Sequence, residues 1–209
     1  MKNDSSEIIL NVVEIFKSIQ GEGANAGRSA VFVRLAGCNM SCWYCDTNWS
    51  ESREMSVSVV LEEVNKLSSP EDYPNNLLIW TGGEPTLQLT DEILESFRDY
   101  YNCIETNGTN PVPGKIDYIS CSPKVSPLVL KKNFNHVNEF RYPIGVGDMV
   151  PDIAQLPVAD NYFISPVFLG KEKERFQIVN ENIEYSIQII KNNPQWRLSL
   201  QLHKLLNIP

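Results

Sequence analysis

The chain has 209 residues, 42% of them hydrophobic and 21% charged, which is typical of one globular domain with a buried core. Its formal net charge of −8 argues against duplex nucleic acid as a partner, because binding to phosphates needs clustered Lys and Arg. No apolar run reaches the ~18–20 residues of a membrane span, and the polar segment Met1–Glu7 lacks the apolar centre of a signal peptide. We therefore expect a cytoplasmic protein with neither a nucleic-acid nor a membrane partner.

The first part of the chain predicts two strands joined by a glycine-rich loop. Ile8–Phe16 and Ala30–Leu35 are rich in β-branched and apolar residues, as strands are. Between them, residues 18–28 contain three glycines, which allow positive φ and a close approach of the backbone to a ligand. Gln20 and Glu22 in this loop are candidate ligand-binding residues, although an ordinary polar turn explains the loop equally well when it is considered alone.

A short loop then carries Cys38, Cys42 and Cys45, three of the five cysteines, spaced Cys-x3-Cys-x2-Cys. A structural zinc site needs four ligands, and a Cys-x-x-Cys redox pair has no use for a third thiol. Three thiolates on one loop suit three irons of a [4Fe–4S] cluster and leave the fourth iron open to a small molecule. A surface loop with incidental cysteines is the simpler alternative. Cys103 and Cys121 lie in apolar stretches and are predicted to be buried thiols.

The rest of the chain alternates predicted helices and strands. Ser56–Leu67 has the apolar spacing of an amphipathic helix with Ser56 as its N-cap, and helices are also predicted over Thr90–Tyr100 and Lys173–Asn192. The predicted strands are Leu77–Trp80, Asn102–Glu105, Ile116–Ser120, Val137–Tyr142, Tyr162–Ile164 and Trp196–Leu202. Strands that alternate with helices predict an α/β fold with a parallel sheet.

Polar motifs recur where these predicted strands end, at Thr81–Glu84, Glu105–Asn107 and Ser122–Lys124. In barrel-like α/β folds this edge of the sheet carries the active site. A chain of 209 residues with few long helices is short for a complete eight-fold barrel. We therefore expect an open, partial (β/α) barrel with a reduced number of crossover helices.

Seven motifs in a fixed order identify a resemblance. They are Glu14-x-Phe16-x-Ser18-x-Gln20-Gly-Glu-Gly23, the three cysteines, Cys45-Asp-Thr47, Thr81-Gly-Gly-Glu-Pro85, Glu105-Thr-Asn-Gly108, Ser122-Pro-Lys124 and Gln201-x-His203-Lys204. The cysteine spacing resembles the radical S-adenosylmethionine (SAM) superfamily. All seven together resemble its 7-carboxy-7-deazaguanine synthase family, which serves queuosine and other 7-deazapurine pathways. The motifs span nearly the whole chain.

The resemblance implies a carbon–nitrogen lyase that converts 6-carboxy-5,6,7,8-tetrahydropterin to 7-carboxy-7-deazaguanine and ammonia. In that family a SAM-derived radical takes a hydrogen from C6 of the pterin, the ring contracts, and the hydrogen returns, so SAM is a cofactor. The resemblance also implies Mg²⁺, an external electron donor such as flavodoxin or ferredoxin, and a homodimer. It implies one radical SAM domain over residues 1–209, whose tail, residues 203–209, closes over the substrate site.

The resemblance assigns a role to each matching position. Cluster ligands are Cys38, Cys42 and Cys45, and the Mg²⁺ ligand is Thr47, for which a loop-capping hydroxyl is the alternative. SAM contacts are Tyr44, Cys45, Asp46, Gly83, Glu84, Ser122, Pro123, Lys124 and Ser165. Substrate contacts are Ile19, Gln20, Gly21, Glu22, Arg34, Thr81, His203 and Pro209. Arg34 is expected to meet the pterin carboxylate, which its fork suits, and the Pro209 carboxylate the amino-pyrimidinone edge.

Two positions depart from the family pattern. Ser165-Pro166 stands where many relatives have Gln-Pro, and Glu139-Phe-Arg141 stands where Glu-x-Lys is commoner. Both changes bear on the predicted SAM contacts alone. Two other functions remain open: a radical SAM activase that makes a glycyl radical on a partner protein, and a non-catalytic Fe–S electron-transfer module. The first would need an open docking face, and the second leaves the open iron without a purpose.

Overall fold

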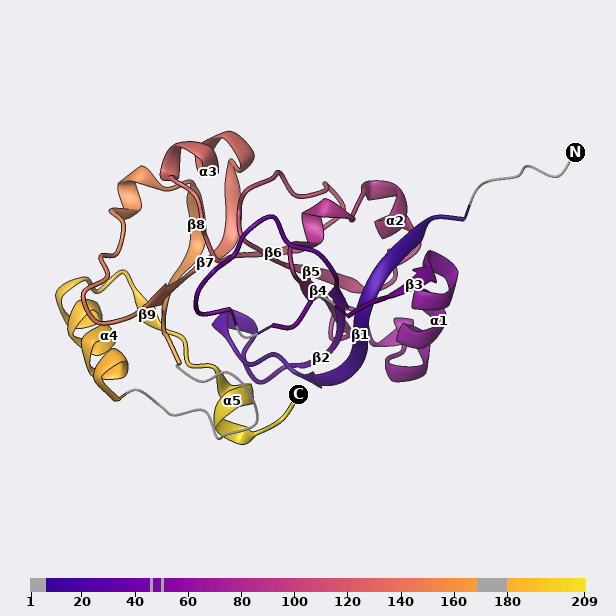
Figure 1. The fold of residues 1–209 in the computed structure, drawn as a ribbon, viewed down its shortest axis with the longest axis horizontal. Helices are drawn as coiled ribbons and strands as arrows, with labels where there is room; N and C mark the ends of the chain where they lie inside the picture. Colours follow the sequence, from indigo (N-terminus) through magenta and orange to yellow (C-terminus); the bar gives the residue numbers. More distant parts are fainter. Residues whose placement is uncertain (1–6, 46, 50, 169–179) are drawn as a thin grey trace, which may run out of the picture.

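The computed structural model describes residues 7–45, 47–49, 51–168 and 180–209. Within them, one sheet with the strand order β3-β1-β2-β4-β5-β6-β7-β8-β9 curves around the centre of the molecule (Figure 1). The strands are β1 (Ile9–Ile19), β2 (Ser29–Leu35), β3 (Arg53–Ser56), β4 (Leu77–Gly82), β5 (Tyr101–Thr106), β6 (Tyr118–Cys121), β7 (His136–Ile144), β8 (Val158–Pro166) and β9 (Arg197–Leu198). β1 is antiparallel to β2 and β3, and every other neighbouring pair is parallel. The sheet ends at β3 and β9 without closing, so the predicted open partial barrel is confirmed.

The helices are α1 (Val57–Leu67), α2 (Asp91–Glu95), α3 (Pro127–Asn133), α4 (Asn180–Asn192) and α5 (Leu202–Leu206). The first four lie around the outside of this curved sheet, and α5 lies apart from them (Figure 1). The connections from β5 to β6 and from β7 to β8, both fully described, contain no α-helix, which confirms the reduced number of crossover helices. None of the helices in the described part of the chain is long and apolar enough to cross a membrane.

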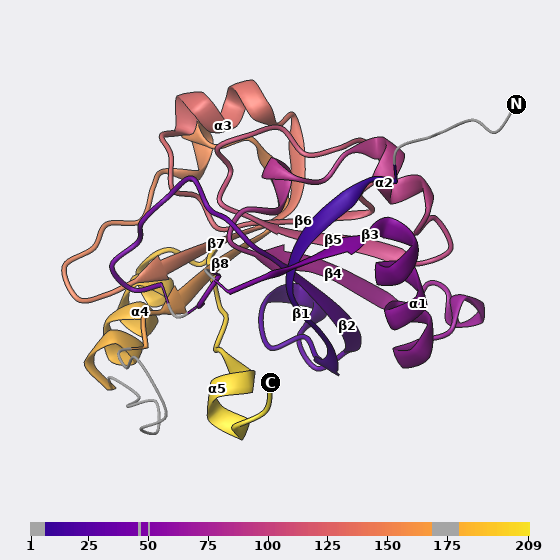
Figure 2. The same ribbon diagram turned by 45° about the vertical axis from the view of Figure 1, so that its right-hand side comes forward.

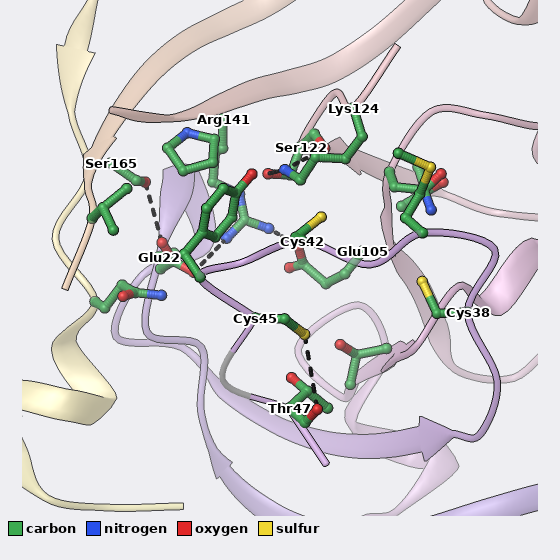
Figure 3. A pocket seen from close by; sticks show the side chains of 18 of the residues that line it. Glu22, Cys38, Cys42, Cys45, Thr47, Glu105, Ser122, Lys124, Arg141 and Ser165 are labelled. Atoms are coloured by element: carbon green, nitrogen blue, oxygen red, sulfur yellow. Dashed lines mark hydrogen bonds and ion pairs between the residues drawn. The ribbon is translucent and has the colours of Figure 1, made fainter. Parts of the chain in front are cut away.

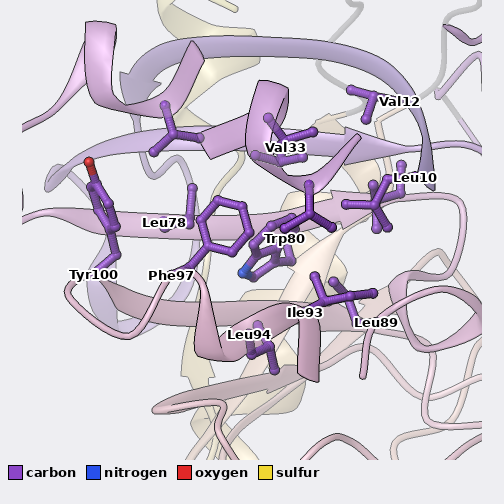
Figure 4. Close-up of a cluster of buried hydrophobic side chains, with 14 of the residues drawn as sticks. Leu10, Val12, Val33, Leu78, Trp80, Leu89, Ile93, Leu94, Phe97 and Tyr100 are labelled. Carbon is purple, nitrogen blue, oxygen red and sulfur yellow. The ribbon is translucent and has the colours of Figure 1, made fainter. Parts of the chain in front are cut away.

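The larger hydrophobic cluster packs α1 and the segment after α2 against one face of β1, β2 and β4 (Figure 4). Trp80 and Phe97 are fully buried at its centre, with ring centroids 4.8 Å apart in an edge-to-face pair. The Trp80 indole N–H donates to Asn102 Oδ1 at 3.0 Å, and Asn102 Nδ2 donates to the carbonyls of Phe97 and Tyr100. Because these buried polar groups are paired, β4 and β5 are held in register beneath the polar motifs at their ends.

A second cluster supports β7 and β8. Trp196 is buried there and makes edge-to-face contacts with Tyr142 and Tyr162, with ring centroids 5.5 and 5.7 Å apart. Side chains of α4 such as Tyr185 and Ile189 pack against it. This cluster therefore supports β7 and β8 near one end of the sheet. Polar residues of these strands lie at the same sheet edge as the polar motifs that follow β4 and β5.

The predicted helix from Thr90 to Tyr100 was too long. α2 ends at Glu95, and the chain continues in tight turns in which Phe97 N donates to Leu94 O and Tyr100 N donates to Phe97 O. These turns carry Phe97 and Tyr100 into the core, so burial of two aromatic rings outweighs helix propensity here. The helix from Ser56 is confirmed, with Ser56 Oγ accepting from Val59 N.

The predicted strand Trp196–Leu202 was mostly wrong. β9 pairs with β8 over only two residues, and Leu202 N then donates to Gly21 O at 3.0 Å, which turns the chain away from the sheet. α5 follows and was not predicted; nor were β3 and α3. Of the predicted helix Lys173–Asn192, residues 173–179 lie outside the described residues, and the described part begins at Asn180.

Candidate functional site

Two adjoining cavities lie at the carboxyl ends of the parallel strands. The first has a volume of about 250 Å³ and the second about 180 Å³. Six of the lining residues are common to both cavities: Glu22, Thr47, Thr81, Glu105, Arg141 and Gln201. These residues form a shared wall, so a molecule in one cavity lies next to a molecule in the other.

Cys38, Cys42 and Cys45 line the first cavity and are partly exposed (Figure 3). Cys45 N donates to Cys42 O at 3.1 Å, so the backbone makes a turn between these two cysteines. Asp46, a predicted SAM contact, lies outside the described residues. Thr47 follows, and its carbonyl oxygen lies 3.8 Å from Cys45 Sγ.

The start of this cysteine loop is fixed by the two neighbouring strand-end motifs. Glu84 N donates to Gly37 O at 2.9 Å, and a Cβ at position 83 would stand 1.8 Å from the same oxygen, so only glycine fits there. Asn39 exchanges side-chain hydrogen bonds with Asn107 and Thr109 at 2.9 and 2.8 Å. Gly83 and Asn107 therefore hold the loop, and Gly83 also lines the first cavity.

The three thiols suit a [4Fe–4S] cluster, because each thiolate can bind a different iron. Among the described residues, no group of three His, Cys, Asp or Glu side chains is arranged to hold one ion. The remaining thiols are buried, and burial raises the pKa of Cys103 and of Cys121 well above the usual range, so both stay neutral and unsuited to a metal. The three loop cysteines are thus the donor set that suits a cluster.

Several of the predicted SAM contacts line the first cavity together with the cysteines. Lys124 Nζ donates to the carbonyl and hydroxyl oxygens of Ser122, each at 3.0 Å, and lies 5.4 Å from the Tyr44 ring centroid. Burial lowers the pKa of Lys124, while the neighbouring Cys42 and Cys121 oppose that shift. Ser165 also lines this cavity and donates to Glu22 Oε1 at 3.2 Å.

Two predicted SAM contacts lie elsewhere. Pro123 is absent from both cavity walls. Glu84 is fully buried, and its carboxylate accepts hydrogen bonds from Thr86, Thr106 and the backbone of Asn107. The structure thus places Glu84 as a link between the ends of β4 and β5, and a SAM contact by its side chain stays a prediction.

The predicted substrate residues line the second cavity. They are Ile19, Gln20, Gly21, Glu22, Arg34, Thr81, His203 and Pro209. Phe16 and Phe32 stack at 5.0 Å on one side, and Arg34 lies 5.7 Å from the Phe16 ring. Arg34 Nε donates to Glu14 Oε1 at 2.7 Å, an ion pair that was not predicted and of which only Glu14 is half exposed. The cavity therefore combines an apolar surface with two guanidinium groups, those of Arg34 and Arg141.

The C-terminal tail packs onto the glycine-rich loop, and α5 lies beside β1 and β2 (Figure 2). A Cβ at Gly21 would stand 2.3 Å from His203 Nδ1, so the loop and the tail touch directly. Ser18 Oγ donates to Pro209 O at 2.7 Å. Asn207 adopts a left-handed φ of 54°, which ends α5 and lets Ile208 N donate to His203 O. His203 and Pro209 are held at the rim of the second cavity as a result.

Three residues of the shared wall were missed in the sequence. Glu105 accepts from Gln20 Nε2 at 2.8 Å, Arg141 is almost fully buried between carboxylates, and Gln201 lines both cavities. Glu105 ends a predicted strand and Gln201 opens the terminal motif, so both positions were visible as candidates. Arg141 lay inside a predicted strand, and its departure from the Glu-x-Lys pattern was related to SAM contacts alone.

Comparison with known proteins agrees with this site. Residues 32–123 match the Radical SAM superfamily. This match and the cysteine-lined cavity on an open partial barrel together define a radical SAM enzyme. A 7-carboxy-7-deazaguanine synthase of Bacteroides thetaiotaomicron is 36% identical over 93% of this chain and 96% of that protein, and one of Haemophilus influenzae is 38% identical over 95% and 93%. The chain belongs to the 7-carboxy-7-deazaguanine synthase family. The crystal structure of QueE from Escherichia coli shares the fold, with a TM-score of 0.62, 22% identity and coverage of 93% and 95% of the two chains.

Proposed function

We propose that this enzyme converts 6-carboxy-5,6,7,8-tetrahydropterin to 7-carboxy-7-deazaguanine and ammonia, with SAM in the first cavity and the pterin in the second. The observation that carries the proposal is the shared wall between a cavity lined by three cysteines and a cavity lined by Arg34. When bound, a [4Fe–4S] cluster on Cys38, Cys42 and Cys45 and SAM would supply the radical.

The residues of the chain then bind, orient and exclude water. Lys124 brings a cation and Ser122 a hydroxyl group to the first cavity. Arg34 offers a cation to the pterin carboxylate, and the stacked Phe16 and Phe32 offer an apolar surface to its ring. Thr81, at the end of β4, lies on the shared wall, where the reacting atoms of the two ligands would meet.

Anaerobic incubation with SAM, a reductant and 6-carboxy-5,6,7,8-tetrahydropterin tests this function. The expected result is a deazapurine product with no net consumption of SAM. An activase would instead consume SAM and modify a partner protein, and an electron-transfer module would leave SAM intact without product. The external electron donor, the homodimer, the single domain over residues 1–209 and the cytoplasmic location stay predictions.

Thr47→Ala is expected to keep the cluster and SAM cleavage but to weaken the dependence of turnover on Mg²⁺. Thr47 lines both cavities and follows the cysteine loop, and a hydroxyl oxygen is a ligand that Mg²⁺ accepts. Turnover is measured against Mg²⁺ concentration, with Thr47→Ser as the matched control that keeps the hydroxyl. An unchanged Mg²⁺ response in Thr47→Ala would assign Thr47 to capping the loop.

Residues appended after Pro209 are expected to raise KM for the pterin severalfold, with folding and cluster content intact. Ser18 Oγ donates a hydrogen bond to Pro209 O at the rim of the second cavity. An extension after Pro209 would displace this oxygen from the rim. KM of a C-terminally tagged protein is compared with that of an N-terminally tagged one. Equal KM and kcat for both would mean that the tail packs without touching the substrate.

A further inference from the structure

We propose that Arg141 is a positioning residue that fixes the carboxylates of Glu22 and Glu105 on the wall between the two cavities. This role rests on the proposed function and extends it to a residue that the family resemblance does not assign to the substrate. Figure 3 shows the Arg141 guanidinium between Glu22 and Glu105.

Each nitrogen of the guanidinium faces a different carboxylate. Arg141 Nη1 lies 3.2 Å from Glu22 Oε2, Nη2 pairs with Glu105 Oε2, and Nε lies 3.0 Å from Glu139 Oε1. The Arg141 side chain is only 6% exposed, against 18% for Glu22 and 22% for Glu105. Glu22 and Glu105 therefore expose more of their side chains to the cavities than Arg141 does.

The three carboxylates come from parts of the chain that only the fold brings together. Glu22 lies in the loop after β1, Glu105 at the end of β5, and Glu139 within β7. Glu139 is almost fully buried and lines neither cavity. It accepts from Ala24 N at 2.8 Å, from Tyr118 Oη at 2.8 Å and from Ser120 Oγ at 2.7 Å. Glu139 thus anchors Arg141 and the glycine-rich loop to the sheet.

Charge explains why the two cavity carboxylates need this support. A carboxylate beside a guanidinium is held in one orientation by the attraction between the two charges. An ionised carboxylate only accepts hydrogen bonds, which suits the N–H groups on the edge of a tetrahydropterin ring. Gln20, a predicted substrate contact, also donates to Glu105 Oε1, so Arg141 and Gln20 hold Glu105 from two sides.

The test measures the dissociation constant of the pterin by calorimetry without reductant for wild type, Arg141→Lys and Arg141→Met. Lysine keeps the charge but lacks the planar fork, so it can pair with fewer carboxylates at once. We expect affinity to fall at least threefold in Arg141→Lys and at least tenfold in Arg141→Met. Cluster content is expected to stay within twofold of wild type. Arg98→Lys, an exposed arginine outside both cavities, is the matched control.

A second measurement separates positioning from structural support. In a Glu105→Gln background, the effect of Arg141→Lys should shrink, because one of the carboxylates that Arg141 fixes has lost its charge. An undiminished loss of pterin affinity in that background, or wild-type pterin affinity in Arg141→Lys, would overturn the proposal. The comparison of Arg141→Lys in the wild-type and Glu105→Gln backgrounds tests the proposal even when Arg141→Met does not fold. Wild-type protein that binds the pterin but forms no product would contradict the proposed function and leave the binding test of Arg141 valid.

Discussion

Cys42→Ala is expected to lose the cluster and all turnover. Cys38, Cys42 and Cys45 line one cavity, and each is expected to bind one iron of a cubane cluster. Removing one of three protein thiolates leaves a second iron without a protein ligand, which a cluster on a partly exposed loop should not survive. After anaerobic reconstitution, wild type should hold about four irons per chain, measured by iron analysis and visible absorbance. Cys38→Ala and Cys45→Ala should behave like Cys42→Ala.

Cys103→Ala and Cys121→Ala are the controls for this experiment. Both thiols are buried, and burial keeps them protonated by raising the pKa of each. Both variants should therefore retain the iron content of wild type. A full complement of iron in Cys42→Ala would refute the cluster assignment, and loss of iron in Cys103→Ala would show that the assay reports folding rather than ligation.

The parallel sheet could be predicted because its strands carry continuous apolar runs. Leu77–Trp80 is buried on both faces and is completely apolar, and polar residues begin at Thr81, where the strand ends. The edge that carries the site followed from this change of composition. α3 was missed although Ser126-Pro127 is a helix start signal, with serine at the N-cap and proline at the first helical position.

The shared wall could not be predicted in full because its contacts join distant parts of the chain. Glu22, Glu105 and Glu139 are separated by many residues, and only the fold places them around Arg141. Local sequence also hid the course of the tail. Trp196–Leu202 has the composition of a strand, and the hydrogen bond from Leu202 N to Gly21 O, which turns the chain toward the cavity, depends on tertiary structure.

Arg34 is the residue of the second cavity on which substrate affinity should depend most. Arg34 lies in β2 next to the stacked rings of Phe16 and Phe32. Its side chain is only 23% exposed, so a carboxylate bound to it would be largely shielded from water. Its Nε pairs with Glu14 at 2.7 Å. Because Glu14 is half exposed, that pair is worth little by itself, and it orients the guanidinium while leaving the other nitrogens of the fork for a ligand.

Arg34→Ala is therefore expected to weaken binding of the pterin at least tenfold, a step of about 1.4 kcal/mol. The loss should exceed that of an exposed ion pair, because a shielded carboxylate would be left without a partner. Calorimetry without reductant measures the dissociation constant apart from turnover. Arg28→Ala is the matched control, since Arg28 pairs with Asn25 and lines neither cavity.

Glu14→Gln adds a second comparison. It keeps Arg34 and removes a competing carboxylate, so affinity for the pterin should hold or rise. Unchanged affinity in Arg34→Ala would show that the pterin carboxylate binds elsewhere, and a loss in Glu14→Gln as large as that in Arg34→Ala would show that the orientation of Arg34, rather than its charge, limits binding.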